Sequence, residues 1–259
     1  MFQMKKLMAA CALALAATVG FAGCGGSNAD TAASGEKVLK VGASVDFAPF
    51  EFQGEGTDEY QGFDMDMIRA VGKQMGYQVE IQNIGFDGLI PALQAKTIDV
   101  IASGFTINDE RKQNVEFSDP YYQSGLTIIV REDEQGIQSF NDLKGKKIAA
   151  QIGTTGAKEG QTLGAEVKEL NTPADCFTEL KNGGVDAVLN DRPVNDYYLH
   201  ESGTTGVKAL PDRLTSEDYG FAVAKGNTEL AEKINAALKE LKENGEYDKI
   251  FDKWFGTKK

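Results

Sequence analysis

Two segments of the chain match in outline, Leu93-Gln94-Ala95-Lys96-Thr97-Ile98-Asp99-Val100-Ile101-Ala102-Ser103-Gly104 and Leu180-Lys181-Asn182-Gly183-Gly184-Val185-Asp186-Ala187-Val188-Leu189-Asn190-Asp191. In both, the end of a helix, a turn, an aspartate and an apolar strand follow one another in the same order. Any two helix-to-strand units share part of this pattern, so the match alone leaves a relation between the halves open. If the halves are related, each presents polar residues past a strand, and these would face one another across a cleft.

Strands and helices alternate around both segments. In the first half we expect strands at 38–43, 78–81 and 98–102, a helix at 62–76 and a second helix capped by Asp87. In the second half we expect strands at 147–151, 166–170 and 185–189, a helix opened by 153–156 and another at 174–181. This alternation is typical of an α/β protein with parallel sheets.

The chain is predicted to cross twice between the halves, first through 121–125 and the apolar run 126–130, and then through the apolar run 220–224. The expected architecture is therefore two α/β domains joined by a two-strand hinge, with lobe 1 at 38–123 plus 221–259 and lobe 2 at 124–220. Helices at 229–243 and 247–255 end the chain, and we expect Trp254 and Phe255 to pack them onto lobe 1.

The amino terminus has the order of a secretory signal peptide, at 1–23. Lys5 and Lys6 precede about 13 apolar residues, fewer than the roughly 20 of a spanning helix. Small residues before Cys24 resemble a bacterial lipobox, which implies lipidation of Cys24 and a flexible tether at 24–37. An uncleaved anchor or ordinary cleavage is the alternative, because Phe21 departs from the lipobox pattern.

The charge excludes several classes of function. The full chain carries 27 basic and 39 acidic side chains, and without the signal peptide 25 face 39, a net charge of −14. A nucleic-acid partner is therefore not expected. One histidine, His200, and no Cys-x-x-Cys pair leave little material for a metal site. We expect no metal, no cofactor and a monomer, with Cys176 as a lone core thiol.

An anion site is predicted just past the first matching segment. Asn108 has the character of a helix N-cap, and Asp109 and Glu110 follow in the first turn, where the helix dipole favours acids. Arg111 then supplies a planar fork that matches a carboxylate. The alternative is a surface arginine that pairs with Glu110 or Asp119.

Several separated motifs resemble the family 3 solute-binding proteins, the polar amino-acid receptors of bacterial ABC importers. The motifs are Gly62-Phe63-Asp64-Met65-Asp66-Met67, Thr106-Ile107-Asn108-Asp109-Glu110-Arg111, Phe117-Ser118-Asp119-Pro120-Tyr121-Tyr122 and Lys253-Trp254-Phe255-Gly256. The resemblance implies a type II periplasmic-binding-protein fold. It also implies an extracytoplasmic receptor that closes on a polar L-amino acid, possibly basic or glutamine, and delivers it to a membrane permease.

The resemblance also implies a set of ligand-binding residues. Arg111, with the backbone amides of Thr106 and Thr155, resembles the clamp on the α-carboxylate. Asp191 resembles the acceptor of the α-ammonium, together with a carbonyl near Ser103 or Gly104. The remaining positions line the pocket, with Phe47 and Phe86 as aromatic walls: Ser44, Asp46, Phe47, Phe86, Gln151, Thr154 and Asn190.

One pocket position departs from several relatives, which have aspartate where this chain has Ser44. Asp46 lies two residues on and would substitute for it. Gln151 resembles some arginine-type receptors, whereas the glutamine-receptor pattern has lysine there. Two other functions remain open on the same scaffold. One is an enzyme resembling the cyclohexadienyl dehydratases, with Glu159 or Glu217 as its acid, and the other is a sensory module. We expect no catalysis.

Overall fold

The computed structural model describes residues 37–54, 56–200 and 204–256. The chain divides into two compact units, Met1–Gly35 and Glu36–Lys259, and every described residue belongs to the second. The predicted signal peptide and Cys24 lie outside the described residues. So does the predicted tether except Lys37, which already belongs to the first strand. Within the described part of the chain, no helix is both long enough and apolar enough to cross a membrane.

The first sheet has the strand order β5-β1-β6-β15-β7. Its strands are β1 (Lys37–Ala43), β5 (Tyr77–Asn83), β6 (Val100–Ile101), β7 (Val115–Phe117) and β15 (Ala222–Ala224). Strands β5, β1 and β6 are parallel, as predicted, but β15 runs antiparallel to both of its neighbours. The sheet is therefore mixed, because β15 returns from the far end of the sequence and inserts antiparallel between β6 and β7.

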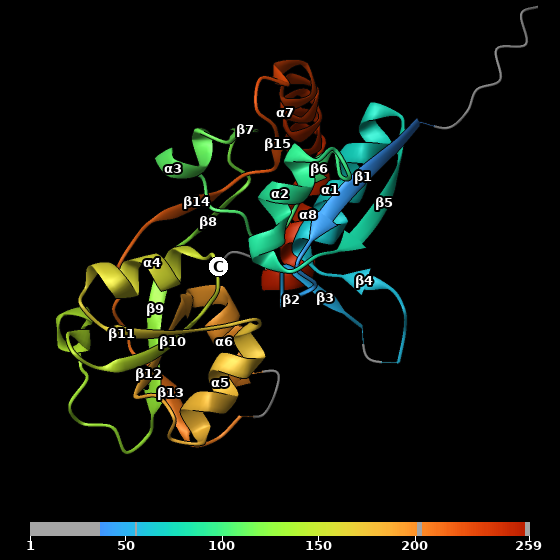
Figure 1. Ribbon diagram of the computed structural model, residues 1–259. Coiled ribbons are helices and arrows are strands. Elements are labelled where there is room, and N and C mark those ends of the chain that lie inside the picture. The colour runs from blue at the N-terminus through green and yellow to red at the C-terminus, as the bar shows by residue number, and fades with distance from the viewer. Residues whose placement is uncertain (1–36, 55, 201–203, 257–259) are drawn as a thin grey trace, which may run out of the picture. The chain divides into compact units, whose positions relative to one another are not determined.

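Helices cover both faces of this sheet (Figure 1). They are α1 (Phe63–Met75), α2 (Leu89–Gln94), α7 (Thr228–Glu243) and α8 (Glu246–Phe255). Successive strand residues point to opposite faces, so Val100 packs in the core beneath α1 and α7 while Ile101 packs against α2. The prediction for the last helix is confirmed, since the ring of Phe255 lies 5.2 Å from that of Phe63 and Trp254 donates to Asp66 at 2.8 Å.

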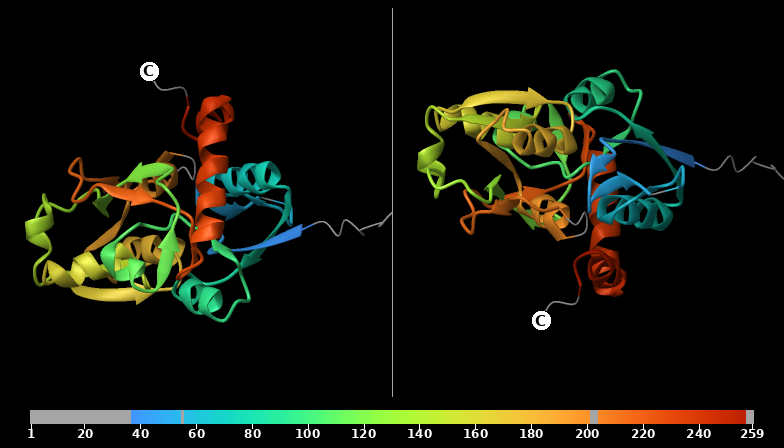
Figure 2. Two further views of the ribbon diagram at one scale, coloured as in Figure 1. Left: turned by 90° about the horizontal axis from the view of Figure 1, so that it is seen from above. Right: turned by 90° about the horizontal axis from the view of Figure 1, so that it is seen from below.

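The second sheet has the order β11-β10-β12-β9-β13. Its strands are β9 (Leu126–Arg131), β10 (Lys147–Gln151), β11 (Glu166–Leu170), β12 (Ala187–Asp191) and β13 (Val207–Ala209). Its helices are α4 (Thr155–Thr162), α5 (Pro173–Lys181) and α6 (Arg192–His200), with a 3-10 turn at Phe140–Leu143. Figure 2 shows these elements gathered on one side of the hinge strands. The predicted two-lobed α/β fold is confirmed.

The hinge is a two-stranded antiparallel ribbon made of β8 (Tyr122–Ser124) and β14 (Glu217–Tyr219). The first hinge strand lies within the predicted crossover 121–130, whereas the second lies just before the predicted 220–224. The apolar runs predicted as crossovers belong to the sheets instead: 126–130 lies in β9 and 222–224 forms β15. Their apolar character is explained by burial inside the two lobes, whereas the hinge strands between the lobes are more polar.

Several element boundaries were predicted correctly and others were wrong. Strands β10 and β11 have the predicted bounds, and α1 ends at Gly76 in the left-handed conformation with φ of 74°. Asp87 caps no helix, because it lies within a 3-10 turn at Phe86–Gly88 and α2 begins only at Leu89. Strand β12 ends at Asp191, so Asn190 and Asp191 belong to the strand rather than following it.

A short antiparallel sheet that was not predicted lies beside the first lobe's strand ends. It consists of β2 (Asp46–Phe47), β3 (Glu51–Gln53) and β4 (Tyr60–Gln61). Gly62 joins it to α1 with φ of 132°, and an added Cβ would overlap the carbonyl of Phe50. Only glycine fits this close approach, which brings the start of α1 against β3.

Candidate functional site

Arg111 is held at the junction between the lobes by the short helix α3 (Asp109–Lys112). Asn108 caps this helix as predicted, accepting a hydrogen bond from the backbone N–H of Arg111 at 2.8 Å. The guanidinium Nη1 donates to the carbonyl of Thr106 in the same lobe at 3.0 Å, and Nη2 donates across to the carbonyl of Gly153 at 3.2 Å. The side chain is therefore fixed at both ends of its fork.

Arg111 is a buried cation, not a surface ion pair. Only 7% of the residue is exposed, and its guanidinium carbon lies 4.1 Å from the centre of the Phe105 ring and 5.2 Å from that of Phe86. In residues 37–54, 56–200 and 204–256 no carboxylate oxygen lies within 4.0 Å of it, and Glu110 pairs with Lys158 instead. The alternative of pairing with Glu110 or Asp119 is wrong. Burial lowers the pKa of Arg111 to about 10.

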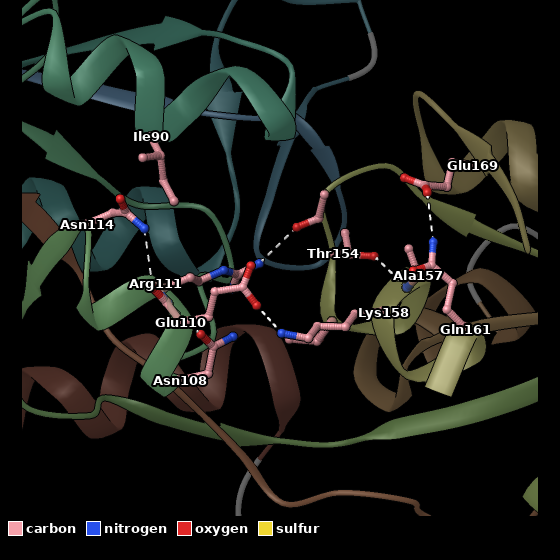
Figure 3. A pocket seen from close by; sticks show the side chains of 12 residues that line it. Ile90, Asn108, Glu110, Arg111, Asn114, Thr154, Ala157, Lys158, Gln161 and Glu169 are labelled. Atoms are coloured by element: carbon pink, nitrogen blue, oxygen red, sulfur yellow. Dashed lines mark hydrogen bonds and ion pairs between the residues drawn. The ribbon is translucent and has the colours of Figure 1, made fainter. Parts of the chain in front are cut away.

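A cavity of about 400 Å³ opens beside this guanidinium (Figure 3). Its walls come from both lobes, with Asn108, Glu110 and Arg111 on one side and Gly153, Thr154 and Thr155 on the other. Thr154 is the N-cap of α4, and its hydroxyl accepts from the backbone N–H of Ala157 at 3.3 Å. The positive end of the α4 dipole and the guanidinium thus border one space, which suits an anion.

Asp191 lies at the hinge rather than in this cavity. Its Oδ1 accepts from the hydroxyl of Ser124 at 2.7 Å and from that of Tyr219 at 2.6 Å, one residue from each hinge strand. Burial raises the pKa of Asp191, and these hydrogen bonds and the charge of Arg111 oppose that rise. Neighbouring Asn190 donates to Asn195 Oδ1 at 3.3 Å.

A second group of predicted residues meets across the lobes. Gln151 Nε2 donates to Asp46 Oδ1 at 3.3 Å and to the carbonyl of Asn171 at 2.9 Å, while the Ser44 hydroxyl donates to Asp46 at 3.2 Å. Burial raises the pKa of Asp46, and the hydrogen bonds from Gln151 and Ser44 oppose it. Ser44 and Asp46 are thus hydrogen-bonded to each other, and the substitution of Asp46 for an aspartate at position 44 stays a prediction.

Asp46 also lines a smaller, largely apolar cavity of about 130 Å³. The first lobe contributes Asp46 and Ala48, and α5 and α6 of the second lobe contribute the rest: Pro173, Ala174, Phe177, Val194, Tyr197 and Tyr198. This space combines apolar walls with one carboxylate at its edge. Such a combination suits a group with an apolar stem and a polar or cationic end.

Ser103, Gly104 and Phe47 lie deeper than the sequence suggested. The Ser103 hydroxyl accepts from the backbone N–H of Ser44 and donates to Glu51 Oε1, both at 2.9 Å. Gly104 has φ of 49°, and an added Cβ would lie 2.8 Å from the Phe47 ring. Close contact with an aromatic ring therefore requires glycine at this position.

Glu217 is the functional candidate that sequence reasoning placed only in the enzymatic alternative. Its Oε2 accepts from the hydroxyl of Thr106 in one lobe at 3.1 Å and from that of Thr155 in the other at 3.0 Å. Burial, followed by the charge of Asp191, raises its pKa to about 7. The pairing of β14 with β8 delivers it to the cleft, and no motif marks it in the sequence.

Most of the chain matches a known protein family. A family model described as bacterial extracellular solute-binding proteins, family 3, matches residues 39–257. The chain belongs to this family. This match confirms the family that was predicted from the separated sequence motifs. The matched residues span both sheets and the hinge.

Its similarity to individual solute-binding proteins extends over most of the chain. Arginine-binding extracellular protein ArtP of Bacillus subtilis is 38% identical over 254 residues, which cover 95% of this chain and 98% of ArtP. A solved structure of an ancestral arginine-binding protein bound to arginine is 45% identical, with a TM-score of 0.81 over 85% of this chain and 98% of that one. A solved structure of an ancestral arginine-binding protein bound to glutamine is 44% identical, with a TM-score of 0.81 over 85% of this chain and 98% of that one.

Proposed function

We propose that this solute-binding protein captures a polar L-amino acid outside the cytoplasm and delivers it to the permease of an ABC importer. The observation that carries the proposal is Arg111, a buried guanidinium between the lobes with no carboxylate oxygen of the described residues within 4.0 Å, although the charges of Glu217 and Asp191 act on it from farther away. A buried charge without a partner is costly unless a ligand supplies one. The α-carboxylate of an amino acid is such a partner.

The remaining ligand contacts are proposed from the resemblance to the family. The α-carboxylate would lie between the guanidinium and the start of α4, near the backbone amides of Thr106 and Thr155. The α-ammonium would meet Asp191 and a carbonyl at Ser103 or Gly104. The other predicted positions would border the ligand, with Phe47 and Phe86 as walls: Ser44, Asp46, Gln151, Thr154 and Asn190.

The side chain of the ligand is proposed to be basic. The small cavity next to Asp46 has apolar walls and a carboxylate, as a methylene stem with a cationic end requires. Glutamine is the neutral alternative, since Gln151 offers an amide beside the same carboxylate. The names of ArtP and of the ancestral arginine-bound and glutamine-bound structures agree with both possibilities.

Capture is proposed to occur by closure of lobe 1, 38–123 plus 221–259, on lobe 2, 124–220. Contacts that cross between the lobes support this motion, namely Arg111 to Gly153, Gln151 to Asp46 and Lys158 to Glu110. The ribbon of β8 and β14 would bend between the open and closed forms. We further propose a monomer anchored to the membrane through a lipid on Cys24.

The experiment is a thermal-shift screen of the twenty amino acids with protein that begins after Cys24. A ligand that binds only the folded form at 1,000 times its Kd stabilises it by about 4.1 kcal/mol. We expect arginine or lysine to raise the Tm most and leucine to leave it unchanged. If none of the twenty amino acids raises the Tm, the proposed receptor function is wrong.

One observation favours an enzyme as the second candidate. Glu217 places a carboxyl group with a pKa of about 7 inside the cleft, and a group with such a pKa can act as a general acid. Incubation with prephenate or arogenate, followed by detection of an aromatic product, tests this candidate. We expect no product, because Glu217 is already hydrogen-bonded to Thr106 and Thr155 as a cross-lobe contact.

A further inference from the structure

Two carboxyl groups, Glu51 and Asp64, lie wholly buried in the first lobe, each with 0% exposure. Glu51 begins β3 and Asp64 lies in the first turn of α1. Glu51 Oε1 accepts from the Ser103 hydroxyl at 2.9 Å. Asp64 Oδ2 accepts from the backbone N–H of Gly104 at 2.8 Å and from the hydroxyl of Tyr121 at 2.6 Å.

The second oxygen of each group has no hydrogen-bond partner. Among the described residues, the buried side-chain polar atoms left without a partner are Glu51 Oε2 and Asp64 Oδ1. Native proteins leave few buried polar atoms unpaired, so two in the same region require an explanation. No described basic residue forms an ion pair with either carboxyl.

The two carboxyl groups converge on one place. Their donors, Ser103 and Gly104, are consecutive residues, and the backbone N–H of Asp64 donates to the carbonyl of Phe50, the residue before Glu51, at 2.9 Å. The charge of Asp64 also raises the pKa of Glu51, as expected for close neighbours. Two like charges that are close together and fully buried cannot both persist.

We propose that Glu51 and Asp64 share a single proton, which resides on Glu51 Oε2 and is donated in a hydrogen bond to Asp64 Oδ1. This arrangement satisfies both orphan oxygens at once and leaves one negative charge on the pair. The charge belongs on Asp64, because Asp64 accepts two hydrogen bonds from Gly104 and Tyr121 whereas Glu51 accepts one from Ser103.

The titration behaviour of the two groups agrees with this assignment. Burial raises the pKa of Glu51 well above its ordinary value, with the charges of Asp64, Asp46 and Asp191 adding to the rise. Burial raises that of Asp64 only to about 7, because Tyr121 and the Gly104 amide stabilise its charged form. The other ionisable group against the pair is Tyr121, whose pKa is raised by burial and by Asp64, so it remains a neutral donor.

The shared proton would position the strand ends that face the cleft. Through Ser103 and Gly104 the pair fixes the turn after β6, and through the Ser103 hydroxyl it also fixes the backbone of Ser44 at the end of β1. Glu51 and Asp64 are therefore positioning residues. Their effect on ligand affinity rests on the proposed function, but the proton itself does not.

The direct test is infrared spectroscopy of the folded protein without ligand. The parent for this test carries Glu217→Gln, because Glu217, with a pKa of about 7, would itself contribute a neutral carboxylic acid at neutral pH. At neutral pH we expect a carbonyl stretching band of a neutral carboxylic acid that is present in this parent and absent when Glu51→Gln is added. Asp66→Asn, a change on the same helix at a half-buried carboxylate that forms an ion pair with Lys253, is the matched control and should keep the band. A parent without the band, or a band that persists in Glu51→Gln, would overturn the proposal.

Unfolding of four proteins provides a second test. In Glu51→Gln the amide N–H of residue 51 replaces the carboxylic O–H and donates to Asp64. In Asp64→Asn the amide N–H of residue 64 donates in the opposite direction, to an ionised Glu51. Each single variant therefore keeps one donor and one acceptor between the two side chains. The double variant sets two N–H groups against each other. We expect its loss of Tm to exceed the sum of the two single losses.

The opposite result has a clear meaning. If both groups were ionised, each amide would relieve repulsion and the double variant would be the most stable of the four proteins, which would overturn the shared proton. Affinity for the best amino acid of the thermal-shift screen is then measured for Glu51→Gln and Glu51→Ala. We expect Kd to change by less than about tenfold in the first and by more in the second. Failure of every amino acid to bind would sink the proposed receptor function and leave the infrared and unfolding results standing.

Discussion

Replacement of Arg111 by methionine should separate ligand binding from stability. In the protein without ligand, burial lowers the pKa of this guanidinium from 12.5 to about 10, a net penalty on its charge of about 3 kcal/mol. Methionine keeps the aliphatic stem beside Phe86 and Phe105 but removes this penalty. The loss of hydrogen bonds to the Thr106 and Gly153 carbonyls offsets part of the gain. We therefore expect an unliganded Tm that is unchanged or higher.

Ligand affinity should change in the opposite direction. Removing one partner of a desolvated charge pair costs about 3–5 kcal/mol, which weakens Kd by roughly 10²–10⁴. Isothermal titration calorimetry with the amino acid that shifts the parent Tm most measures this loss. Thermal unfolding with and without that amino acid should show that the ligand-induced rise in Tm has disappeared, although the protein remains folded.

Arg131→Met is the matched control. Arg131 is also partly buried and its Nη1 donates to two backbone carbonyls, those of Leu180 at 3.1 Å and Val185 at 2.6 Å, but within the second lobe. This variant should lose about 1–3 kcal/mol of stability and keep its affinity. An Arg111→Met protein that binds within tenfold of the parent would refute the carboxylate clamp. One that unfolds would show that Arg111 serves the fold instead.

Three further variants probe other parts of the site. Asp46→Asn should weaken arginine or lysine binding by roughly tenfold to a hundredfold in calorimetry and leave glutamine binding nearly unchanged, and equal losses would exclude Asp46 as a contact of a cationic side chain. The pKa of Glu217 is raised from 4.5 to about 7, so between these pH values the folded form binds more protons than the unfolded form. The free energy of unfolding should therefore fall by up to about 3 kcal/mol as the pH rises from 4.5 to 7. Glu217→Gln should lack that part of the slope in urea unfolding at pH 5 and pH 8, and an unchanged slope would place the titration elsewhere. Gly62→Ala should lower the free energy of unfolding by at least about 2 kcal/mol in the same assay, since the φ of 132° at Gly62 and the Phe50 carbonyl leave no room for a Cβ. A variant as stable as the parent would contradict that packing.

The elements that the sequence predicted best are those with strong local signals. Strands β10 and β11 and helix α1 carry apolar periodicity and a glycine stop, and their bounds were predicted to within a residue or two. The hinge carries no such signal. Strands β8 and β14 have three residues each and form through pairs such as Ser124 with Glu217, far apart in the chain, so only tertiary structure defines them.

The presence or absence of a local sequence signal also explains which site residues could be predicted. Arg111 could be predicted because Asn108 and the acids of its first turn mark a helix start within four residues. Asp87 looked like a similar cap, yet the chain there forms a 3-10 turn and the helix starts later. Glu217 could not be recognised, because its partners Thr106 and Thr155 lie 111 and 62 residues away. Nothing in the local pattern distinguishes it from the many surface acids of this chain.

The charge of the cleft favours a cationic ligand. Two acids, Asp191 and Glu217, lie near enough to Arg111 for their charges to act on it. Asp46 adds a third carboxylate next to the small cavity, so these four residues comprise three acids and one base. Burial raises the pKa of all three acids, which means that each would gain from a nearby positive charge. A neutral zwitterion brings equal charges of both signs and leaves this excess in place. A basic amino acid would bring one further positive charge, and in the proposed pose the small cavity would place its far end at Asp46. We therefore expect the acids to select for charge and Arg111 to select for the carboxylate that every amino acid shares.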